Sequence, residues 1–260
     1  MLALVLRILG VYWLYEKWLR HVVLSRPLPK HVAIIVDGNR RWALKRGWPV
    51  WLGHRAGADR LEEILEYIVK LGVETVTLFA LSTENLRRDP VEVGELFKLI
   101  RERAQRMITS PLIHSERVSV RILGRRDLIP SEVRKELEKL ETVTSGYRDH
   151  FLNIAVAYGG RAEIVDAVRI IAARVKNGLL DINRIDEKTI EECLYTQGLP
   201  HPEPELIIRT SGEVRVSNFL LWQSAYSELI FQDVNFPDIR VIDILRSIRT
   251  FQQRNRRFGR

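Results

Sequence analysis

The stretch His31-Val-Ala-Ile-Ile-Val-Asp37-Gly38 places a run of apolar residues directly before a polar turn. Such a run is typical of a strand that is buried on both faces of a parallel sheet. Apolar residues then recur at helical spacing from Ala58 to Leu71, and the pattern stops at Gly72. The order of strand, polar turn and helix predicts one unit of an α/β fold.

The same alternation continues along the chain. Short apolar runs predict strands over residues 73–81, 118–123, 151–157 and 206–208, and periodic segments predict helices over 90–107, 131–143 and 161–176, with Asp89 as a cap. No long linker, repeat or low-complexity block occurs from His31 onward. We therefore expect an α/β fold in which a single domain, residues 27–260, has a mostly parallel central sheet flanked by helices, and residues 1–26 add an N-terminal apolar helix.

Composition narrows the class of protein and of partner. Hydrophobic residues make up 46% of the 260 residues and charged residues 28%, which is typical of a soluble globular protein. The 41 Lys and Arg exceed the 33 Asp and Glu, so polyanionic partners such as nucleic acid, acidic lipid or phosphorylated small molecules are favoured. A single cysteine, Cys193, excludes an internal disulfide and a cysteine-based zinc site and indicates a reducing, cytoplasmic setting.

Residues 1–24 are rich in Leu, Val and aromatic residues. Charged side chains interrupt and close this stretch, which argues against a transmembrane helix, and no small-residue cleavage site follows, which argues against a secretory signal. One interpretation is a helix that lies on an anionic membrane surface, because its aromatic residues are of the kind found at the headgroup level. The other is an ordinary helix that packs on the domain or on a partner subunit. The aromatic residues are Tyr12, Trp13, Tyr15 and Trp18, and the charged residues are Arg7, Glu16, Lys17 and Arg20.

Four of the predicted strands end in polar loops, at residues 37–41, 82–85, 158–161 and 209–213. Open parallel sheets bind ligands beyond the carboxyl ends of their strands, so we expect these loops to meet along one edge. A carboxylate, guanidinium groups, hydroxyls and glycines suit a phosphate-rich ligand with a divalent cation. The amides of Gly38 and Asn39 would face an anion if a helix begins there.

Other phosphate-binding motifs are absent from the sequence. It contains neither G-x-x-x-x-G-K-[ST] nor G-x-G-x-x-G, so a nucleotide P-loop or a Rossmann fingerprint is not supported. The D-D-x-x-D pattern, which would bind several magnesium ions around a diphosphate, is also missing. Any diphosphate must then be held mainly by arginines and backbone amides, with one carboxylate-bound Mg²⁺.

Five segments, in order from His31 towards the C-terminus, resemble the cis-prenyltransferases, the undecaprenyl and dehydrodolichyl diphosphate synthase family. They are HVAIIVDGNRRWA (31–43), GHRAG (53–57), LFALSTEN (78–85), LNIAVAYGGR (152–161), and RTSGEVRVSNFLLWQ (209–223) with YSE (226–228). The resemblance implies repeated condensation of isopentenyl diphosphate onto an allylic diphosphate, farnesyl or geranylgeranyl diphosphate, with each new double bond cis. The product would be a long-chain polycis-polyprenyl diphosphate, a precursor of glycosyl carrier lipids.

The resemblance also implies roles for individual residues. Asp37 matches the family aspartate that handles Mg²⁺ and is needed for turnover, and Glu228 matches a second metal contact. Asn85 matches the position assigned to proton removal; a carboxamide is a poor base, so we expect it to position the substrate and pass the proton to a phosphate oxygen. The allylic diphosphate pocket is matched by Gly38, Asn39, Arg40, Arg41 and His54 with Trp42 adjoining, the isopentenyl diphosphate clamp by Arg209, Arg215, Val216 and Ser217, and further substrate contacts by Ser82, Thr83, Glu84, Leu86 and Arg88.

This chain departs from the bacterial pattern at three positions. Val50 replaces an arginine of the allylic pocket, for which Lys45 or Arg46 could compensate, and Leu86 replaces a tryptophan. Val214 replaces a histidine beside the metal, which weakens the metal role of Glu228. These differences resemble an archaeal or eukaryotic-like branch of the family, and we expect an archaeal-type member. A growing apolar chain needs a dry tunnel, for which the helix over 91–108 and the strand near 120–123 are candidates. The sequence does not determine the product length.

The resemblance implies a homodimer, because Arg257-Phe258-Gly259 is similar to the R-x-G ending that reaches the neighbouring subunit's site. An alternative is a non-catalytic partner subunit of a heteromeric enzyme, but such subunits lose the first-motif aspartate and arginines, and this chain keeps Asp37 and Arg41. A basic RNA-binding module is a third possibility. It is disfavoured because the aromatic residues do not interleave with basic ones on a recognisable strand, so we expect no nucleic acid partner.

Overall fold

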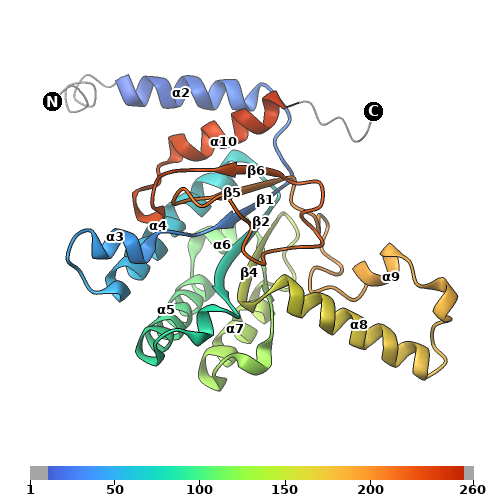
Figure 1. Cartoon of the computed structure of the whole chain (residues 1–260). Helices are drawn as coiled ribbons and strands as arrows, with labels where there is room; N and C mark the ends of the chain where they lie inside the picture. Colours follow the sequence, from blue (N-terminus) through green and yellow to red (C-terminus); the bar gives the residue numbers. More distant parts are fainter. Residues whose placement is uncertain (1–10, 255–260) are drawn as a thin grey trace.

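Six strands form one sheet in the order β3-β4-β2-β1-β5-β6, and every neighbouring pair is parallel. The computed structural model describes residues 11–254. The predicted α/β fold with a parallel central sheet is confirmed (Figure 1). The strands are β1 (His31–Ile35), β2 (Thr75–Ser82), β3 (Val118–Leu123), β4 (His150–Tyr158), β5 (Leu206–Arg209) and β6 (Glu228–Phe231).

Helices flank the sheet, and α8 and α9 project away from its body at the lower right of Figure 1. A short 3₁₀ turn, η1 (Asn85–Arg87), follows β2. The helices are α2 (Val11–Leu24), α3 (Asn39–Leu44), α4 (Val50–Leu71), α5 (Pro90–Ile108), α6 (Pro111–Ser115), α7 (Ser131–Thr144), α8 (Gly160–Lys176), α9 (Glu187–Glu191) and α10 (Val241–Gln253).

The residues of β1 alternate between the two faces of the sheet. Val32 and Ile34 belong to the large core cluster, to which α2, α4, α5, α7 and α10 contribute. Ala33 and Ile35 belong to a second cluster, together with Phe219. All five residues of the strand are buried. Burial on both faces explains why this stretch is continuously apolar rather than alternating.

The first turn of α5 is fixed by its cap. The Asp89 carboxylate accepts hydrogen bonds from the backbone N–H groups of Val91, at 2.9 Å, and of Glu92, at 3.2 Å. Pro90 occupies the first helical position, where its missing N–H costs nothing. The predicted cap is confirmed, and it sets the direction in which the first side chains of α5 point.

The sequence pattern does not predict α3, α10 or β6, and α4 begins at Val50 rather than at Ala58. Helix α3 has only six residues, and β6 is a four-residue edge strand that is only partly buried, so neither is long enough to show a period. Helix α10, in contrast, could have been predicted from the sequence, because Ile242, Leu245 and Ile248 recur at helical spacing.

Helix α2 packs against α10 at the top of Figure 1. Leu19 and Val23 are fully buried in the large core cluster, and the Gln252 amide donates a hydrogen bond of 2.9 Å to the carbonyl of Val23. The described part of the N-terminal segment is therefore a helix that packs on the domain. Residues 1–10 lie outside the described residues. No helix within residues 11–254 combines the length and the hydropathy that crossing a bilayer requires.

Candidate functional site

The polar loops at the carboxyl ends of β1, β2 and β5 meet around one cleft of about 890 Å³. Its lining comes from segments that are far apart in the sequence, as a parallel sheet requires. The predicted site residues that line it are Asp37, Gly38, Asn39, Arg40, Arg41, His54, Ser82, Glu84, Asn85, Arg88, Arg209, Arg215 and Ser217. The structure therefore brings together most of the predicted substrate contacts.

Four of the predicted substrate contacts do not line this cleft. The indole N–H of Trp42, on α3, donates a hydrogen bond of 2.7 Å to the carboxylate of Asp238. The hydroxyl of Thr83 donates to Glu84, at 3.2 Å, so Thr83 supports a lining residue. The other two are Leu86, which packs against the large core cluster, and Val216, whose backbone carbonyl accepts a hydrogen bond from Phe219.

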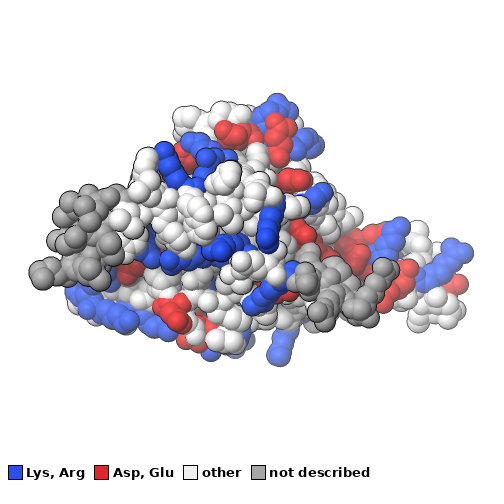
Figure 2. All heavy atoms as spheres, turned by 90° about the horizontal axis from the view of Figure 1, so that it is seen from above, with Lys and Arg blue, Asp and Glu red and all other residues white. Residues whose placement is uncertain are grey.

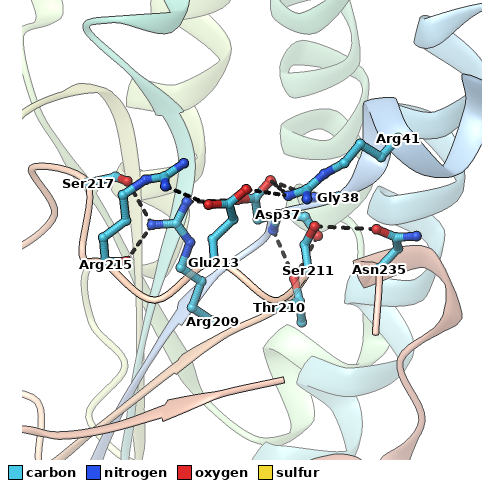
Figure 3. A network of polar contacts seen from close by, with 10 residues as sticks. All are labelled: Asp37, Gly38, Arg41, Arg209, Thr210, Ser211, Glu213, Arg215, Ser217 and Asn235. Carbon is cyan, nitrogen blue, oxygen red and sulfur yellow. Dashed lines mark hydrogen bonds and ion pairs between the residues drawn. The ribbon is translucent and has the colours of Figure 1, made fainter. Parts of the chain in front are cut away.

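Asp37 follows β1 by two residues, lines the cleft and lies in the middle of a network of polar contacts (Figure 3). Its carboxylate accepts a hydrogen bond of 2.7 Å from the N–H of Gly38 and forms an ion pair of 2.8 Å with Arg209. Gly38 has a φ of 99°, and a Cβ at this position would lie 2.5 Å from the side-chain oxygen of Asn235. A glycine is therefore required where the chain turns from β1 into α3.

Arg209 is the most deeply buried cation of the cleft, with 5% of its side chain exposed. It forms hydrogen bonds to the carbonyl of Arg215 and, at 2.7 Å, to the hydroxyl of Ser217. Its Nε is buried and has no hydrogen-bond partner among residues 11–254. A cation held this firmly, with one donor still unsatisfied, is preorganised for an anionic ligand.

Glu213, in the loop after β5, pairs with two arginines of the cleft. Glu213 lies 3.2 Å from Arg41 and 2.5 Å from Arg215 (Figure 3). Ser211 and Ser217 have φ values of 81° and 48°, in the left-handed region that side chains rarely adopt. Backbone strain of this kind is typical of ligand-binding loops. The cleft thus carries guanidinium groups whose present partners an incoming diphosphate could replace.

A second polar cluster lies on the α4 and α5 side of the cleft. His54 Nε2 lies 3.2 Å from a Glu92 oxygen, Arg88 lies 3.0 Å from the same oxygen, and Arg40 lies 3.5 Å from the other one. Burial lowers the pKa of His54, and the neighbouring Glu92, which acts in the opposite direction, does not offset this effect. The imidazole is therefore mostly neutral at pH 7.

Ser82 and Asn85 close a tight turn at the end of β2. The side-chain oxygen of Asn85 accepts a hydrogen bond of 3.2 Å from the N–H of Ser82, and the hydroxyl of Ser82 accepts one of 3.1 Å from the N–H of Asn85. Burial tends to raise the pKa of the adjacent Glu84, but hydrogen bonds from its backbone, Asn218, Ser82 and Thr83 outweigh burial and lower it. Glu84 is therefore a carboxylate at neutral pH.

An apolar cavity of about 120 Å³ lies beneath the cleft, between α4 and α5. The cavity opens towards the polar site, because the cavity and the cleft share five lining residues: Val36, Asn39, His54, Ala80 and Leu96. The predicted wall from the helix over 91–108 agrees with the structure. The opposite wall comes from α4 and β2, whereas the strand near 120–123 lines no part of this cavity. That part of the expectation is wrong, because β4 separates β3 from β2 in the sheet.

A further cavity of about 390 Å³ lies towards the amino ends of β2 and β4. It shares Glu62, Leu65 and Met107 with the apolar cavity. The three spaces therefore follow one another, from the carboxyl end of the sheet to its amino end, and the middle one is the most apolar.

The structure does not bring Glu228 to Asp37. Glu228 is the first residue of β6, where it pairs with Leu206 and forms a salt bridge with Arg254. Because β1, β5 and β6 are parallel and in register, Glu228 lies at the amino end of the sheet and Asp37 at the carboxyl end. A magnesium ion shared by both within one chain is therefore ruled out, and this expectation is corrected.

Other parts of the predicted site cannot be placed in the same way. Within residues 11–254 no group of three or more His, Cys, Asp or Glu side chains is arranged to hold a metal ion. The tail residues Arg257 and Gly259 lie outside the described residues.

Among the described residues, four polar or charged residues of the site are missing from the sequence-based set. Arg161, Glu213 and Asn218 line the cleft, and the polar strand-end loops already contained the first two. Glu92 gave no such signal, because an acidic residue in the first turn of a helix is ordinary. Its importance depends on which side chains the fold brings next to it.

Comparison with known proteins agrees with this geometry. The chain matches the undecaprenyl diphosphate synthase family of prenyltransferases over residues 35–259. It is 55% identical over 250 residues to the tritrans,polycis-undecaprenyl-diphosphate synthase (geranylgeranyl-diphosphate specific) of Methanopyrus kandleri, covering 96% of this chain and 92% of the relative. It is 46% identical over 254 residues to an isoprenyl transferase of Thermus thermophilus, covering 96% of each.

A solved structure is also similar. Lavandulyl diphosphate synthase from Lavandula x intermedia, in complex with dimethylallyl diphosphate, superimposes with a TM-score of 0.85 at 35% identity. The match covers 90% of this chain and 99% of that one. The archaeal relatives confirm the resemblance to archaeal-type members. The chain therefore belongs to the cis-prenyltransferases, the family of undecaprenyl diphosphate synthases, and is a transferase of prenyl groups.

Proposed function

We propose that this chain extends geranylgeranyl diphosphate by successive additions of isopentenyl diphosphate, each with a cis double bond. The sequence leaves two primers open. We choose geranylgeranyl diphosphate because it appears in the names of the relatives from Methanopyrus kandleri and Pyrococcus horikoshii, which are 55% and 51% identical to this chain. The observation that carries the proposal is the succession of spaces. A cleft with two cationic clusters opens directly into an apolar cavity, so the site has room for charged heads and for a hydrocarbon tail.

A primer panel tests this proposal. Purified protein would be given Mg²⁺, labelled isopentenyl diphosphate and dimethylallyl, geranyl, farnesyl or geranylgeranyl diphosphate, and the products would be sized. We expect the highest kcat/KM with geranylgeranyl diphosphate and products many isoprene units long. Absence of incorporation with every primer would contradict the proposal and favour the non-catalytic partner subunit. A single coupling of dimethylallyl units would also contradict it.

The two diphosphates would bind on opposite sides of Asp37 in the cleft. Arg40, Arg41, His54 and the amides of Gly38 and Asn39 would bind the allylic diphosphate, because Asn39 and His54 also line the mouth of the apolar cavity. The tail of a substrate bound there can enter the cavity directly. Arg209, Arg215 and Ser217 would hold isopentenyl diphosphate on the other side of Asp37.

Mg²⁺ is the cation that fits the donor set. Asp37 offers a partly exposed carboxylate in the cleft, and the lack of a larger acidic cluster within residues 11–254 leaves the remaining ligands to diphosphate oxygens and water. When bound, the ion would supply positive charge to the leaving pyrophosphate. Arg41, which pairs with Asp37 on the allylic side, would help to hold that pyrophosphate, while Arg209 pairs with Asp37 from the isopentenyl diphosphate side.

Asn85 would position isopentenyl diphosphate for loss of its proton. Its carbonyl oxygen already accepts the N–H of Ser82, so its NH₂ group would be the part of the side chain that donates to a diphosphate oxygen in the cleft. A phosphate oxygen held in this way is a better proton acceptor than a carboxamide.

Leu65 and Met107 mark the passage by which the growing chain would leave the middle cavity, since both also line the next one. Leu65→Trp narrows this passage without touching the polar site. We expect shorter products from this variant, with kcat/KM for the first condensation within about twofold of the wild type. An unchanged product distribution would contradict this path.

The α8 and α9 region is the surface that we propose for a second copy of the chain. It projects from the body of the molecule, and two large apolar side chains there, Leu179 and Ile182, are 77% and 66% exposed (Figure 1). Apolar groups this exposed are typical of an interface. Light scattering should give twice the 30.3 kDa of one chain, and Leu179→Ser with Ile182→Ser should shift it towards monomer, whereas Leu128→Ser should not. A monomeric wild type would contradict this assignment.

The tail would then complete the neighbouring site. Asp37→Ala and Arg257→Ala chains, each weak alone, should regain activity when mixed, because one site of the mixed dimer has both an intact Asp37 and an intact incoming tail. If mixing restores nothing although mixed dimers form, Arg257 does not serve the neighbouring site.

We further propose that α2 touches an anionic membrane surface with its outer face. Trp13 is 58% exposed, Trp18 is also exposed, and Lys17 lies 3.7 Å from the Trp13 ring. Figure 2 looks onto this face and shows Lys and Arg beside uncharged surface. This combination suits the headgroup region of a bilayer.

Because Leu19 and Val23 belong to the core, the test uses surface substitutions rather than a truncation. Trp13→Ala with Trp18→Ala should lower co-flotation with vesicles that contain acidic lipid, and Trp51→Ala, an exposed tryptophan on α4, should not. Equal flotation of all variants would contradict the proposal.

A further inference from the structure

We infer that Glu92 is a positioning residue of the allylic diphosphate pocket, which it organises by tethering Arg40, His54 and Arg88. The inference deepens the proposed function and rests on it. Unlike Arg40, His54 and Arg88, Glu92 is not among the described residues that line the cleft. Its action must therefore pass through the three side chains that do.

The fold fixes the place of Glu92 before any ligand arrives. Glu92 is the third residue of α5, and its backbone N–H is held by the Asp89 cap. Only 11% of its side chain is exposed. A carboxylate near the N-terminus of a helix is also stabilised by the helix dipole. The negative charge is thus anchored by the helix rather than by the ligand site.

Three elements contribute the tethered groups. Arg40 belongs to α3, His54 to α4, and Arg88 follows η1. One oxygen of Glu92 lies 3.0 Å from Arg88 and 3.2 Å from His54, and the other lies 3.5 Å from Arg40. A single carboxylate therefore ties together three segments that the sequence separates widely.

The chemistry of each contact aims the tethered group at the cleft. Nε2 of His54 must carry a proton to donate to the carboxylate, so Nδ1 of the neutral ring is an acceptor and can donate to a diphosphate only after it takes up a proton; the contact with Glu92 fixes the orientation of the ring. Arg40 and Arg88 use one guanidinium nitrogen each on Glu92, so their remaining N–H groups are available for a diphosphate.

The contacts of Glu92 with Arg40 and Arg88 reduce two free-energy costs of binding a diphosphate. Two neighbouring guanidinium groups repel each other, and each long side chain loses rotamer freedom when a ligand fixes it. Glu92 offsets the repulsion and restricts both side chains in advance. Its own negative charge would repel a diphosphate, but it lies behind the cations, which are closer to the cleft. We therefore expect removal of Glu92 to weaken the allylic pocket rather than to strengthen it.

Steady-state kinetics with both substrates tests the inference. For Glu92→Ala we expect the KM of the allylic diphosphate to rise about tenfold, equivalent to the loss of about one charge-assisted contact, and the KM of isopentenyl diphosphate to stay within about twofold. Glu92→Gln keeps an acceptor for His54 and Arg88 and should show a smaller rise. Glu95→Ala is the matched control, one turn along α5 on an exposed carboxylate, and should behave as the wild type.

A double-mutant cycle separates positioning from a general structural effect. If Glu92 acts through Arg88, Glu92→Ala should have a smaller effect on the allylic KM in an Arg88→Ala background than in the wild type. An allylic KM within about twofold of the wild type for Glu92→Ala would overturn the inference, as would an equal rise in both KM values. Should Glu92→Ala fail to fold, an unchanged allylic KM for Glu92→Gln would do so. Absence of all activity in the wild type would instead refute the proposed function.

Discussion

The two ends of the central sheet use polar residues in opposite ways. At the carboxyl end, Asp37 in the loop after β1 and Arg209 at the last position of β5 face an open cleft. Nearer the amino ends, His31, Thr77 and Asn153 are fully buried on neighbouring strands, and His31 and Asn153 both form hydrogen bonds to the Thr77 hydroxyl, at 2.7 Å and 3.0 Å. Polar groups of one end are arranged for a ligand, and those of the other end hold strands together.

We infer from this difference that the carboxyl end of the sheet serves the reaction and that the buried polar residues serve stability. Changes at the carboxyl end should alter turnover with little change in stability, and changes among the buried polar residues should do the reverse. Each prediction below tests one side of that contrast.

The largest effect is expected for Asp37→Ala. Loss of the carboxylate that pairs with Arg41 and Arg209 should lower kcat by about a thousandfold or more, because electrostatic stabilisation of the leaving pyrophosphate is lost. Incorporation of labelled isopentenyl diphosphate measures it, with Asp37→Asn as the isosteric control and circular dichroism to verify the fold. A kcat close to that of the wild type would remove Asp37 from the mechanism.

A smaller effect is expected for Arg209→Ala. The KM of isopentenyl diphosphate should rise about a hundredfold, because a buried guanidinium that contacts the ligand is lost, and the KM of the allylic diphosphate should change much less. Arg46→Ala is a control. Arg46 does not take the place of the missing arginine of the allylic pocket, because it pairs with Asp238 and is not among the described residues that line the cleft. Equal increases in both KM values would show that Arg209 does not distinguish the two sides of the site.

The smallest effect is expected for the pH dependence that His31 causes. Burial lowers the pKa of His31 to about 3, against an ordinary value of 6.5. Between these values the unfolded chain binds a proton that the folded chain does not, so the free energy of unfolding falls as the pH falls. From pH 7 to pH 5 this residue should remove about 2 kcal/mol of stability.

Urea unfolding of the wild type and of His31→Gln at both pH values measures this contribution. The variant should lose less stability between pH 7 and pH 5 than the wild type does. Equal losses in both proteins would show that His31 is not held neutral in the folded state.

Much of the site follows from the sequence because parallel strands place their carboxyl ends together. The apolar run before Asp37 and the one before Arg209 are enough to predict that these two residues meet, and they lie 2.8 Å apart. Glu228 fails the same reasoning, since no apolar pattern reveals the short strand β6 or the end of it at which Glu228 lies.

Two further features depend on three-dimensional packing that the sequence pattern does not contain. Glu92 gains its role only because α3, α4 and η1 each bring one side chain to it. The wall of the middle cavity also depends on strand order, because β4 lies between β2 and β3, and no residue of β3 lines that cavity. Propensity predicts which elements form, and the order of strands decides which of them share a cavity.

The most direct test of the whole account is a crystal structure with Mg²⁺ and an unreactive thio analogue of geranylgeranyl diphosphate. The account predicts that the diphosphate contacts Arg40, Arg41 and the amide of Gly38, and that the hydrocarbon chain runs between α4 and α5 past Leu96. A diphosphate bound away from these groups, or a chain that lies outside the apolar cavity, would contradict it.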